Sequence, residues 1–237
     1  MDWTPYDAAL FDLDGVLTPT ATVHMAAWSE MFNDVLAGMD GQEPYTDADY
    51  YAYVDGKPRY DGVRSFLAAR GIELPEGDPE DPPEAETVCG LGNRKNDAFN
   101  AVLERDGVAA YPGSLALLRA LGETTVQLAV VSSSKNAPAV LAAAGIADLF
   151  PVVVDGAVAS ADGLPGKPEP DTFLAAAERL GVAKERAVVL EDAESGVAAG
   201  RAGDFGLVVG VDRGAGAETL RERGADIVVT DLAEILP

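Results

Sequence analysis

Cysteine and histidine are nearly absent from this sequence, which contains one of each in 237 residues. A single cysteine, Cys89, excludes an internal disulfide and is compatible with a reducing, cytoplasmic compartment. One cysteine and one histidine, His24, also exclude a typical zinc or iron site. No apolar run approaches the length of a membrane span and no basic-then-apolar leader opens the chain. We therefore expect a cytoplasmic protein that is neither membrane-embedded nor secreted.

Positive charge is also scarce, because 17 basic residues stand against 40 acidic ones and the formal net charge is -23. A surface of that sign repels nucleic acid and anionic lipid, so we expect neither as a partner. It would also repel a phosphorylated metabolite. Such a substrate would need positive charge concentrated locally, by a metal or by a few placed basic side chains. Because the chain has only five lysines, each basic residue is considered individually as a possible contact for such a substrate.

Hydrophobic residues make up 48% of the chain, which is enough for a proper core. After residue 107, short β-branched runs alternate with alanine-rich segments at helical spacing. The predicted strands are 8–11, 126–131, 152–154, 187–190, 207–211 and 227–229. The predicted helices between them are 114–121, 137–143, 171–180, 195–201 and 217–223. This alternation predicts right-handed crossovers and a parallel sheet covered by helices on both faces.

About ninety mostly helical residues separate the first strand from the others. Helical spacing is found near residues 21–36, 46–54, 60–69 and 85–105, and an acidic, proline-rich loop covers 73–86. We therefore expect an α/β fold, a doubly wound parallel sheet with an inserted helical domain. Residues 1–18 and 109–237 would form the α/β core, and residues 19–108 the helical domain inserted after the first strand.

Polar residues follow four of the predicted strands, at the edge where ligands bind in such sheets. They are Asp12 and Asp14 after the first strand, residues 132–136 after the second, Lys167 after the third, and residues 191–192 after the fourth. Carboxylates gathered at one edge repel one another unless a hard cation lies among them, and oxygen ligands favour Mg²⁺. The set therefore indicates a magnesium-assisted reaction of a phosphate.

This set suits phosphoryl transfer, in which catalysis is mostly positioning and charge neutralisation. A carboxylate beside Mg²⁺, here Asp12, is a competent nucleophile toward phosphorus. Asp14 could protonate the leaving oxygen and later take a proton from the acceptor. The Lys167 ammonium, the Ser132 hydroxyl and backbone N–H groups could hold the other phosphate oxygens. Ser133 competes with Ser132 for this role.

Four short motifs resemble the signatures of the haloacid dehalogenase superfamily, in the family's order along the chain. The sequence FDLDGV at 11–16 resembles the first, Ser132 the second, KPEPD at 167–171 the third, and ED at 191–192 the fourth. The resemblance implies a Rossmann-like core with a small helical cap. It also implies an aspartyl phosphate on Asp12 and acid–base catalysis by Asp14. Ser132 and Lys167 would contact the phosphate. Asp12, the Asp14 carbonyl and Asp192 would hold Mg²⁺, with Glu191 assisting. Glu191 could instead accept a hydrogen bond beside the ligands.

The helical segment resembles that of the β-phosphoglucomutase family in three places, at residues 20–24, 56–59 and 94–97. The resemblance assigns substrate or cap roles to Thr20, His24, Gly56, Arg59 and Lys95, and to Asn136 after the serine cluster. In that family, the arginine matching Arg59 binds the phosphate that is not transferred. For Arg59 and Lys95 the alternative is a solvated surface position, and we expect Lys57 to face solvent.

The leading functional hypothesis is a β-phosphoglucomutase that interconverts β-glucose 1-phosphate and glucose 6-phosphate through a bisphosphate. The alternative is a phosphatase of the same superfamily that hydrolyses a small sugar phosphate or related phosphomonoester. Pro19 stands where the mutases commonly have aspartate, which leaves this choice open. A binding module without catalysis is disfavoured, because neither a dinucleotide-binding glycine motif nor a P-loop is present. We expect a monomer whose partner is a small phosphorylated sugar.

Overall fold

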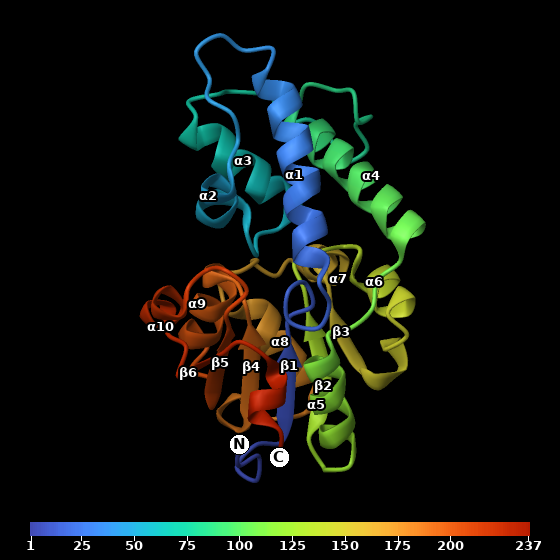
Figure 1. Ribbon diagram of the computed structural model, residues 1–237, viewed down its shortest axis with the longest axis vertical. Helices are drawn as coiled ribbons and strands as arrows, with labels where there is room; N and C mark the ends of the chain where they lie inside the picture. Colours follow the sequence, from blue (N-terminus) through green and yellow to red (C-terminus); the bar gives the residue numbers. More distant parts are fainter. The chain divides into compact units, whose positions relative to one another are not determined.

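Six strands form one sheet in the order β3-β2-β1-β4-β5-β6, and every neighbouring pair is parallel. The computed structural model describes residues 1–237, and in Figure 1 the strands run from right to left in this order. The strands are β1 (Ala8–Phe11), β2 (Gln127–Val131), β3 (Val152–Val154), β4 (Ala187–Glu191), β5 (Leu207–Val211) and β6 (Ile227–Val229). The structure confirms the predicted α/β fold with a parallel sheet.

Helices cover the sheet and bury its central strands. The helices of this part are α5 (Pro112–Gly122), α6 (Ala137–Ala143), α7 (Gly156–Asp162), α8 (Asp171–Leu180), α9 (Glu194–Ala202) and α10 (Ala217–Arg223), with 3₁₀ turns η2 (Ala147–Leu149), η3 (Lys184–Arg186) and η4 (Leu232–Ile235). Helix α8 packs against β1, β2 and β3, and α9 packs against β4 and β5. Leu10, Val131, Phe173 and Val189 are fully buried between them. Burial on both faces explains why the strands are continuous apolar runs.

The chain divides into two compact units, residues 1–19 with 108–237 and residues 20–107. These limits differ by one residue from the predicted ones, 18/19 and 108/109. We call the first the sheet unit and the second the helical unit. None of the helices in either unit combines the length with the apolar character that a bilayer crossing requires.

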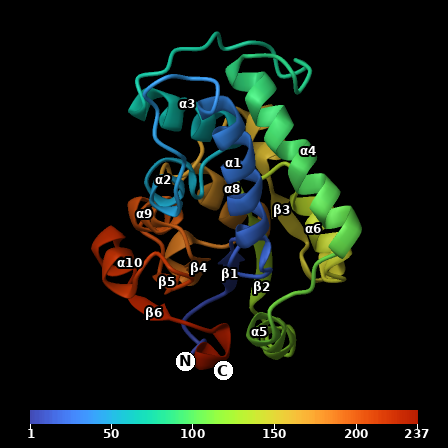
Figure 2. The same cartoon turned by 45° about the horizontal axis from the view of Figure 1, so that its top comes forward.

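The helical unit is built from α1 (Thr20–Leu36), α2 (Asp47–Asp49), the π-helical turn η1 (Tyr50–Val54), α3 (Arg59–Ala69) and α4 (Val88–Asp106). Figures 1 and 2 both show α4 lying alongside α1, with which it makes extensive contact. Phe32, Phe66 and Leu91 lie at the centre of its core. The helix predicted near 46–54 is confirmed over 47–54, and the structure adds that it widens into a π-helical turn at Tyr50.

Two helix starts differ from the prediction, because a side-chain cap sets where each helix begins. The predicted helix 85–105 begins later, at Val88, because the Thr87 hydroxyl accepts a hydrogen bond from the Gly90 N–H at 2.9 Å. Helix α7 was not predicted at all, since its small residues show no clear periodicity. Asp155 caps it by accepting from the backbone N–H groups of Ala157 and Val158 at 2.9 and 2.8 Å.

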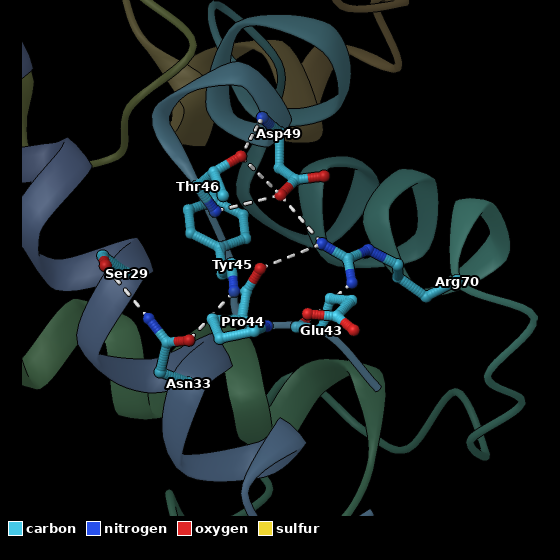
Figure 3. A network of polar contacts seen from close by, with 8 residues as sticks. All are labelled: Ser29, Asn33, Glu43, Pro44, Tyr45, Thr46, Asp49 and Arg70. Carbon is cyan, nitrogen blue, oxygen red and sulfur yellow. Dashed lines mark hydrogen bonds and ion pairs between the residues drawn. The ribbon is translucent and has the colours of Figure 1, made fainter. Parts of the chain in front are cut away.

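A polar network fastens the segment that leads into η1 (Figure 3). The Arg70 guanidinium, at the end of α3, donates to the Glu43 carbonyl at 2.8 Å and forms an ion pair with Asp49 at 2.8 Å. Asn33 of α1 accepts a hydrogen bond from the backbone N–H of Tyr45 at 2.9 Å. The segment is therefore held from two helices at once, which fixes where the π-turn begins.

Tyr45 is buried in this region, and its hydroxyl has no hydrogen-bond partner. A buried hydroxyl without a partner costs about 1–3 kcal/mol. We therefore expect Tyr45→Phe to raise the free energy of unfolding by about 1 kcal/mol at neutral pH. Tyr60→Phe is the matched control. The Tyr60 hydroxyl donates to the Asn93 side chain at 3.0 Å, so its removal should not raise the free energy of unfolding. Urea unfolding of both variants measures the difference.

The same site predicts a pH dependence. Burial, and secondarily the charge of Asp49, raise the pKa of Tyr45 above its usual value of about 10. Above pH 10 the unfolded chain releases a proton that the folded chain retains, so stability falls as pH rises. Tyr45→Phe should therefore lose less stability than the wild type between pH 9 and about 11. Parallel losses in the two proteins would contradict this assignment.

Candidate active site

Asp12 lies at the carboxyl end of β1, the central strand of the sheet. The register aligns Phe11 with Val130 of β2 on one side and with Leu190 of β4 on the other. Asp12 N–H continues the ladder by donating to the Leu190 carbonyl at 2.9 Å. The next residues on the flanking strands are Val131 and Glu191, so the strands themselves bring Asp12 and Glu191 side by side. Asp12 is 7% exposed.

Lys167 joins the ends of these three strands. Its ammonium donates to Asp12 Oδ1 and to Glu191 Oε1, both at 2.6 Å. A third hydrogen bond, at 3.0 Å, goes to the Val131 carbonyl. Lys167 does not follow the third strand directly as predicted, because α7 intervenes. The side chain is nevertheless buried, and its ammonium lies 4.9 Å from the centre of the Phe173 ring.

Glu191 is fully buried, and both of its carboxylate oxygens have partners. Oε1 accepts from Lys167, and Oε2 accepts from the Ala193 N–H at 2.8 Å. A side chain on Gly196 would collide with this carboxylate, because a Cβ there would lie 1.7 Å from Oε1. The sequence therefore provides a glycine on α9 where Glu191 needs space. Glu191 therefore orients Lys167 through Oε1, while the Ala193 N–H holds Oε2.

Asp12, Glu191 and Asp192 offer carboxylate oxygens that all lie within 4.8 Å of one another, and all three residues are buried. When ionised, three carboxylates beside the single ammonium of Lys167 leave two negative charges in a buried space. Such an excess is costly unless a cation compensates it. The donors are oxygens only, which is the set preferred by a hard divalent cation. The residues present therefore fit a divalent metal.

The electrostatics of the site agree with that charge balance. Burial raises the pKa of the Asp12 carboxyl well above its usual range, against the opposing effect of Lys167, while the charges of Glu191 and Asp14 add to the increase. Burial lowers the pKa of the Lys167 ammonium, but the charges of Asp12 and Glu191 outweigh it and the net direction is upward. Lys167 thus stays positively charged, and a bound cation would favour ionised Asp12.

The remaining residues predicted for this edge of the sheet follow closely after Asp12 or after the end of β2. Asp14, half-buried, pairs in an isolated parallel bridge with Thr18. Ser132 is 3% exposed, directly after Val131, whose carbonyl Lys167 contacts; its hydroxyl accepts from the Ser134 N–H at 3.1 Å. Ser133 is half-buried, and Asn136 directly precedes α6. The sheet unit therefore brings Asp12, Ser132, Lys167, Glu191 and Asp192 to one edge.

In the helical unit, His24 of α1 and Lys95 of α4 meet in a hydrogen bond between the Lys95 ammonium and His24 Nδ1. Both residues are buried. The imidazole stacks on Phe99 with 4.1 Å between the ring centres. The ammonium lies 5.1 Å from the ring centres of both Trp28 and Phe99. The structure therefore excludes the alternative that Lys95 is a solvated surface residue.

Arg59 begins α3 and contacts neutral groups. Its guanidinium donates to Asn96 Oδ1 at 2.6 Å and to Asn93 Oδ1 at 3.3 Å. Burial lowers the pKa of Arg59, which marks its charge as incompletely solvated. Amide partners orient a guanidinium without neutralising it, so this charge is suited to hold an anion.

The other residues predicted in the helical unit lie at the ends of elements. Thr20 is buried as the first residue of α1, and Gly56 follows η1 with a φ of +70°, which favours glycine. The prediction for Lys57 is wrong: it is partly buried, and its ammonium donates to Ser65 Oγ at 2.8 Å.

One further strand end, which was not among the predicted site residues, carries a basic side chain. Asp212 and Arg213 follow β5 at the edge that carries Asp12 and Asp192. Arg213 Nε donates to the Gly15 carbonyl at 2.8 Å, and its guanidinium lies 4.0 Å from the centre of the Tyr111 ring. The rule that selected the other strand ends would have selected Arg213 too.

The model of the haloacid dehalogenase-like hydrolases matches residues 6–204 of this chain. The chain belongs to this family. A β-phosphoglucomutase of Mycobacterium tuberculosis is 52% identical over 238 residues, which cover 97% of this chain and 91% of the relative. Hexitol phosphatase A of Escherichia coli is 31% identical over 95% of this chain and 91% of its own length. These haloacid dehalogenase-like relatives identify the chain as an enzyme.

Solved structures agree with this placement in the family. The crystal structure of a β-phosphoglucomutase from Clostridium difficile superposes with a TM-score of 0.78 at 25% identity. The match covers 97% of this chain and 93% of the other. This haloacid dehalogenase-like chain is thus similar to the β-phosphoglucomutases in sequence and in fold.

Proposed function

We propose that this protein is a magnesium-dependent β-phosphoglucomutase that works through an aspartyl phosphate on Asp12. It would interconvert β-glucose 1-phosphate and glucose 6-phosphate through a bisphosphate intermediate. The observation that carries the proposal is the buried cluster in which Lys167 links Asp12 to Glu191 beside Asp192. This cluster supports the proposal because it holds a carboxylate, a buried ammonium and further carboxylate oxygens at one edge of the sheet.

Asp12, Asp192 and the Asp14 carbonyl would hold Mg²⁺, with Glu191 beside them. Bound there, the ion would neutralise phosphate oxygens and keep the Asp12 carboxylate ionised. Lys167 and the Ser132 hydroxyl, with Ser133 as a further candidate, would bind the transferring phosphate through charge-assisted hydrogen bonds. All three N–H groups of Lys167 already have partners, so the ammonium would exchange its hydrogen bond to Asp12 for one to a phosphate oxygen while Glu191 and the Val131 carbonyl keep the charge in place.

In the first step, a carboxylate oxygen of Asp12 would form a bond to one phosphorus of the sugar bisphosphate as the bond between that phosphorus and the sugar oxygen breaks, which leaves glucose 6-phosphate. Asp14 donates its proton to the departing oxygen. In the second step, a hydroxyl of β-glucose 1-phosphate would give its proton to Asp14 and attack the phosphorus on Asp12, which releases the Asp12 carboxylate and forms the bisphosphate again. Atoms and charges balance over the cycle, and the phosphoryl group has moved from one sugar oxygen to another.

A mutase binds a sugar bisphosphate in two orientations, so it needs a cation for the phosphate that is not being transferred. Arg59 fits this requirement, because its partners are the neutral amides of Asn93 and Asn96. His24 and Lys95, with Thr20, Gly56 and Asn136, are proposed to position the sugar or the acid–base carboxyl.

The second candidate is a phosphatase, in which water replaces the sugar hydroxyl in the second step. The 31% identity to a relative named hexitol phosphatase A favours retaining it. Incubation with β-glucose 1-phosphate, Mg²⁺ and a trace of glucose 1,6-bisphosphate separates the two. We expect glucose 6-phosphate, with little inorganic phosphate. Stoichiometric release of inorganic phosphate without glucose 6-phosphate would establish the phosphatase instead.

Arg59→Ala is expected to impair sugar bisphosphates selectively. Loss of a charge-assisted contact costs about 1.5–3 kcal/mol, so kcat/KM for the mutase reaction should fall roughly 10- to 150-fold. Hydrolysis of p-nitrophenyl phosphate, which has no second phosphate, should change little. Arg64→Ala is the control, since Arg64 lies on the same helix in exposed ion pairs with Asp61 and Glu76. Equal losses on both substrates would show that Arg59 does not bind the second phosphate.

A further inference from the structure

The turn that follows β1 is closed on itself by backbone hydrogen bonds. Thr18 N–H and Leu17 N–H both donate to the Leu13 carbonyl, at 3.0 and 2.9 Å, and Gly15 N–H donates to the Thr18 carbonyl at 2.8 Å. Asp14 lies inside this turn, and its orientation therefore depends on how the turn as a whole is held.

Three consecutive carbonyl oxygens of the turn accept hydrogen bonds from elsewhere in the sheet unit. The Gly15 carbonyl accepts from Arg213 Nε at 2.8 Å. The Val16 carbonyl accepts from the Ser114 hydroxyl at 2.6 Å, and the Leu17 carbonyl accepts from the Tyr111 N–H at 2.9 Å. Two of these donors lie at the start of α5, and the third follows β5. The turn is thus held from outside at every residue from 15 to 17.

Arg213 connects the supports to one another. Its Nη1 donates to the Thr230 carbonyl beyond β6 at 2.8 Å, and its guanidinium carbon lies 4.0 Å from the centre of the Tyr111 ring. Its Nη2 is buried and makes no hydrogen bond. Planar stacking with two donors in a fixed fork is a geometry that arginine provides and lysine does not. Stacking on the Tyr111 ring therefore fixes the Arg213 side chain together with its hydrogen bonds to the Gly15 and Thr230 carbonyls.

The residue that Arg213 contacts also touches the proposed metal site. Gly15 has a φ of +93°, and a Cβ built on it would lie 1.9 Å from Asp192 Oδ2. The backbone of the turn is consequently packed against the Asp192 carboxylate. Any shift of the Gly15 peptide would move Asp14 on one side of it and disturb Asp192 on the other.

We propose that Arg213 is a positioning residue that fixes Asp14 for acid–base catalysis, acting through the Gly15 carbonyl and the Tyr111 ring. The inference rests on the proposed function, since it assigns Asp14 the proton transfer. Arg213 itself touches no reacting atom. Without it, the turn keeps its internal hydrogen bonds and its two donors at the start of α5, but the Gly15 carbonyl loses its only contact with the segment that follows β5.

Arg213→Met tests the inference, because methionine has a similar apolar length but no donors. The leaving group of a sugar phosphate needs a proton, whereas p-nitrophenolate leaves readily without one. We expect kcat/KM for β-glucose 1-phosphate to fall about 10- to 100-fold, and kcat/KM for p-nitrophenyl phosphate to fall less than about threefold. Arg213→Lys should lie between Arg213→Met and the wild type. Arg119→Met, an exposed arginine on α5, is the control for loss of charge.

A double-variant cycle tests the route through Tyr111. Tyr111→Leu removes the stacked ring, and we expect its effect on β-glucose 1-phosphate to be less than additive with that of Arg213→Met. Full additivity would contradict a shared support.

Equal losses of Arg213→Met on both substrates would overturn the positioning role while leaving the proposed function intact. If Asp12→Asn were as active on p-nitrophenyl phosphate as the wild type, that result would overturn the proposed function, and this inference with it.

Discussion

Asp12→Asn is expected to abolish phosphoryl transfer, lowering kcat by about 10⁴-fold or more. The amide keeps the shape of the carboxyl but cannot form the acyl phosphate. Lys167 retains its contact with Glu191 in this variant, so the fold should persist. Turnover of β-glucose 1-phosphate and of p-nitrophenyl phosphate should be lost together, because both require the same nucleophile. Steady-state assays on the two substrates measure this loss.

A thermal-shift comparison serves as the control for folding. The melting temperature of Asp12→Asn should lie close to that of the wild type. Beryllium fluoride with Mg²⁺ mimics an aspartyl phosphate, and a ligand that binds only the folded state raises the melting temperature. We expect this rise in the wild type and not in Asp12→Asn. Substantial residual activity in the variant would show that Asp12 is not the nucleophile.

Lys167→Met is expected to affect both stability and activity. The ammonium is buried between two carboxylates, and removing one partner of a buried ion pair typically costs about 3–5 kcal/mol. Loss of a preorganised cation at the transferring phosphate should also lower kcat by about 10²- to 10³-fold. Denaturant unfolding and steady-state kinetics measure the two effects.

Lys184→Met provides the matched comparison for this variant. Lys184 lies in the same unit and is 3.5 Å from Asp204 in a more exposed ion pair, which is worth about 0–1 kcal/mol. Mg²⁺ should restore part of the stability of Lys167→Met, since a cation among Asp12, Glu191 and Asp192 takes over some of the neutralisation. A Lys167→Met protein as stable and active as Lys184→Met would contradict the assigned role.

The strands were predictable from sequence because their burial on both faces demands continuous apolar runs. The predicted 8–11, 152–154, 207–211 and 227–229 match the observed strands. Their order could not be read from any single run, since it depends on how the crossovers pack. Helix α7 shows the limit at the local level. Its small side chains bear no periodic signal, and only the caps at its two ends, Asp155 and Gly163, mark it.

The candidate site was predictable as a set of strand ends but not as a set of contacts. The alignment of β1 with β2 and β4 brings Val131 and Glu191 beside Asp12, and no spacing in the sequence encodes that register. The burial of Lys95 could not be predicted either, because a lysine on a helix is expected to face solvent unless the positions of its aromatic neighbours are known. Arg213 could have been selected by its place after β5, but its contacts with the Gly15 and Thr230 carbonyls could not be predicted, because backbone carbonyls carry no residue identity.

Phosphorus NMR of the protein with Mg²⁺ and β-glucose 1-phosphate, with and without a trace of glucose 1,6-bisphosphate, would detect a covalent phosphate on Asp12 itself. We expect a protein-bound acyl phosphate signal that is absent from Asp12→Asn, together with conversion to glucose 6-phosphate that the bisphosphate accelerates. Conversion without such a signal, or the same signal in Asp12→Asn, would contradict a covalent phosphate on Asp12.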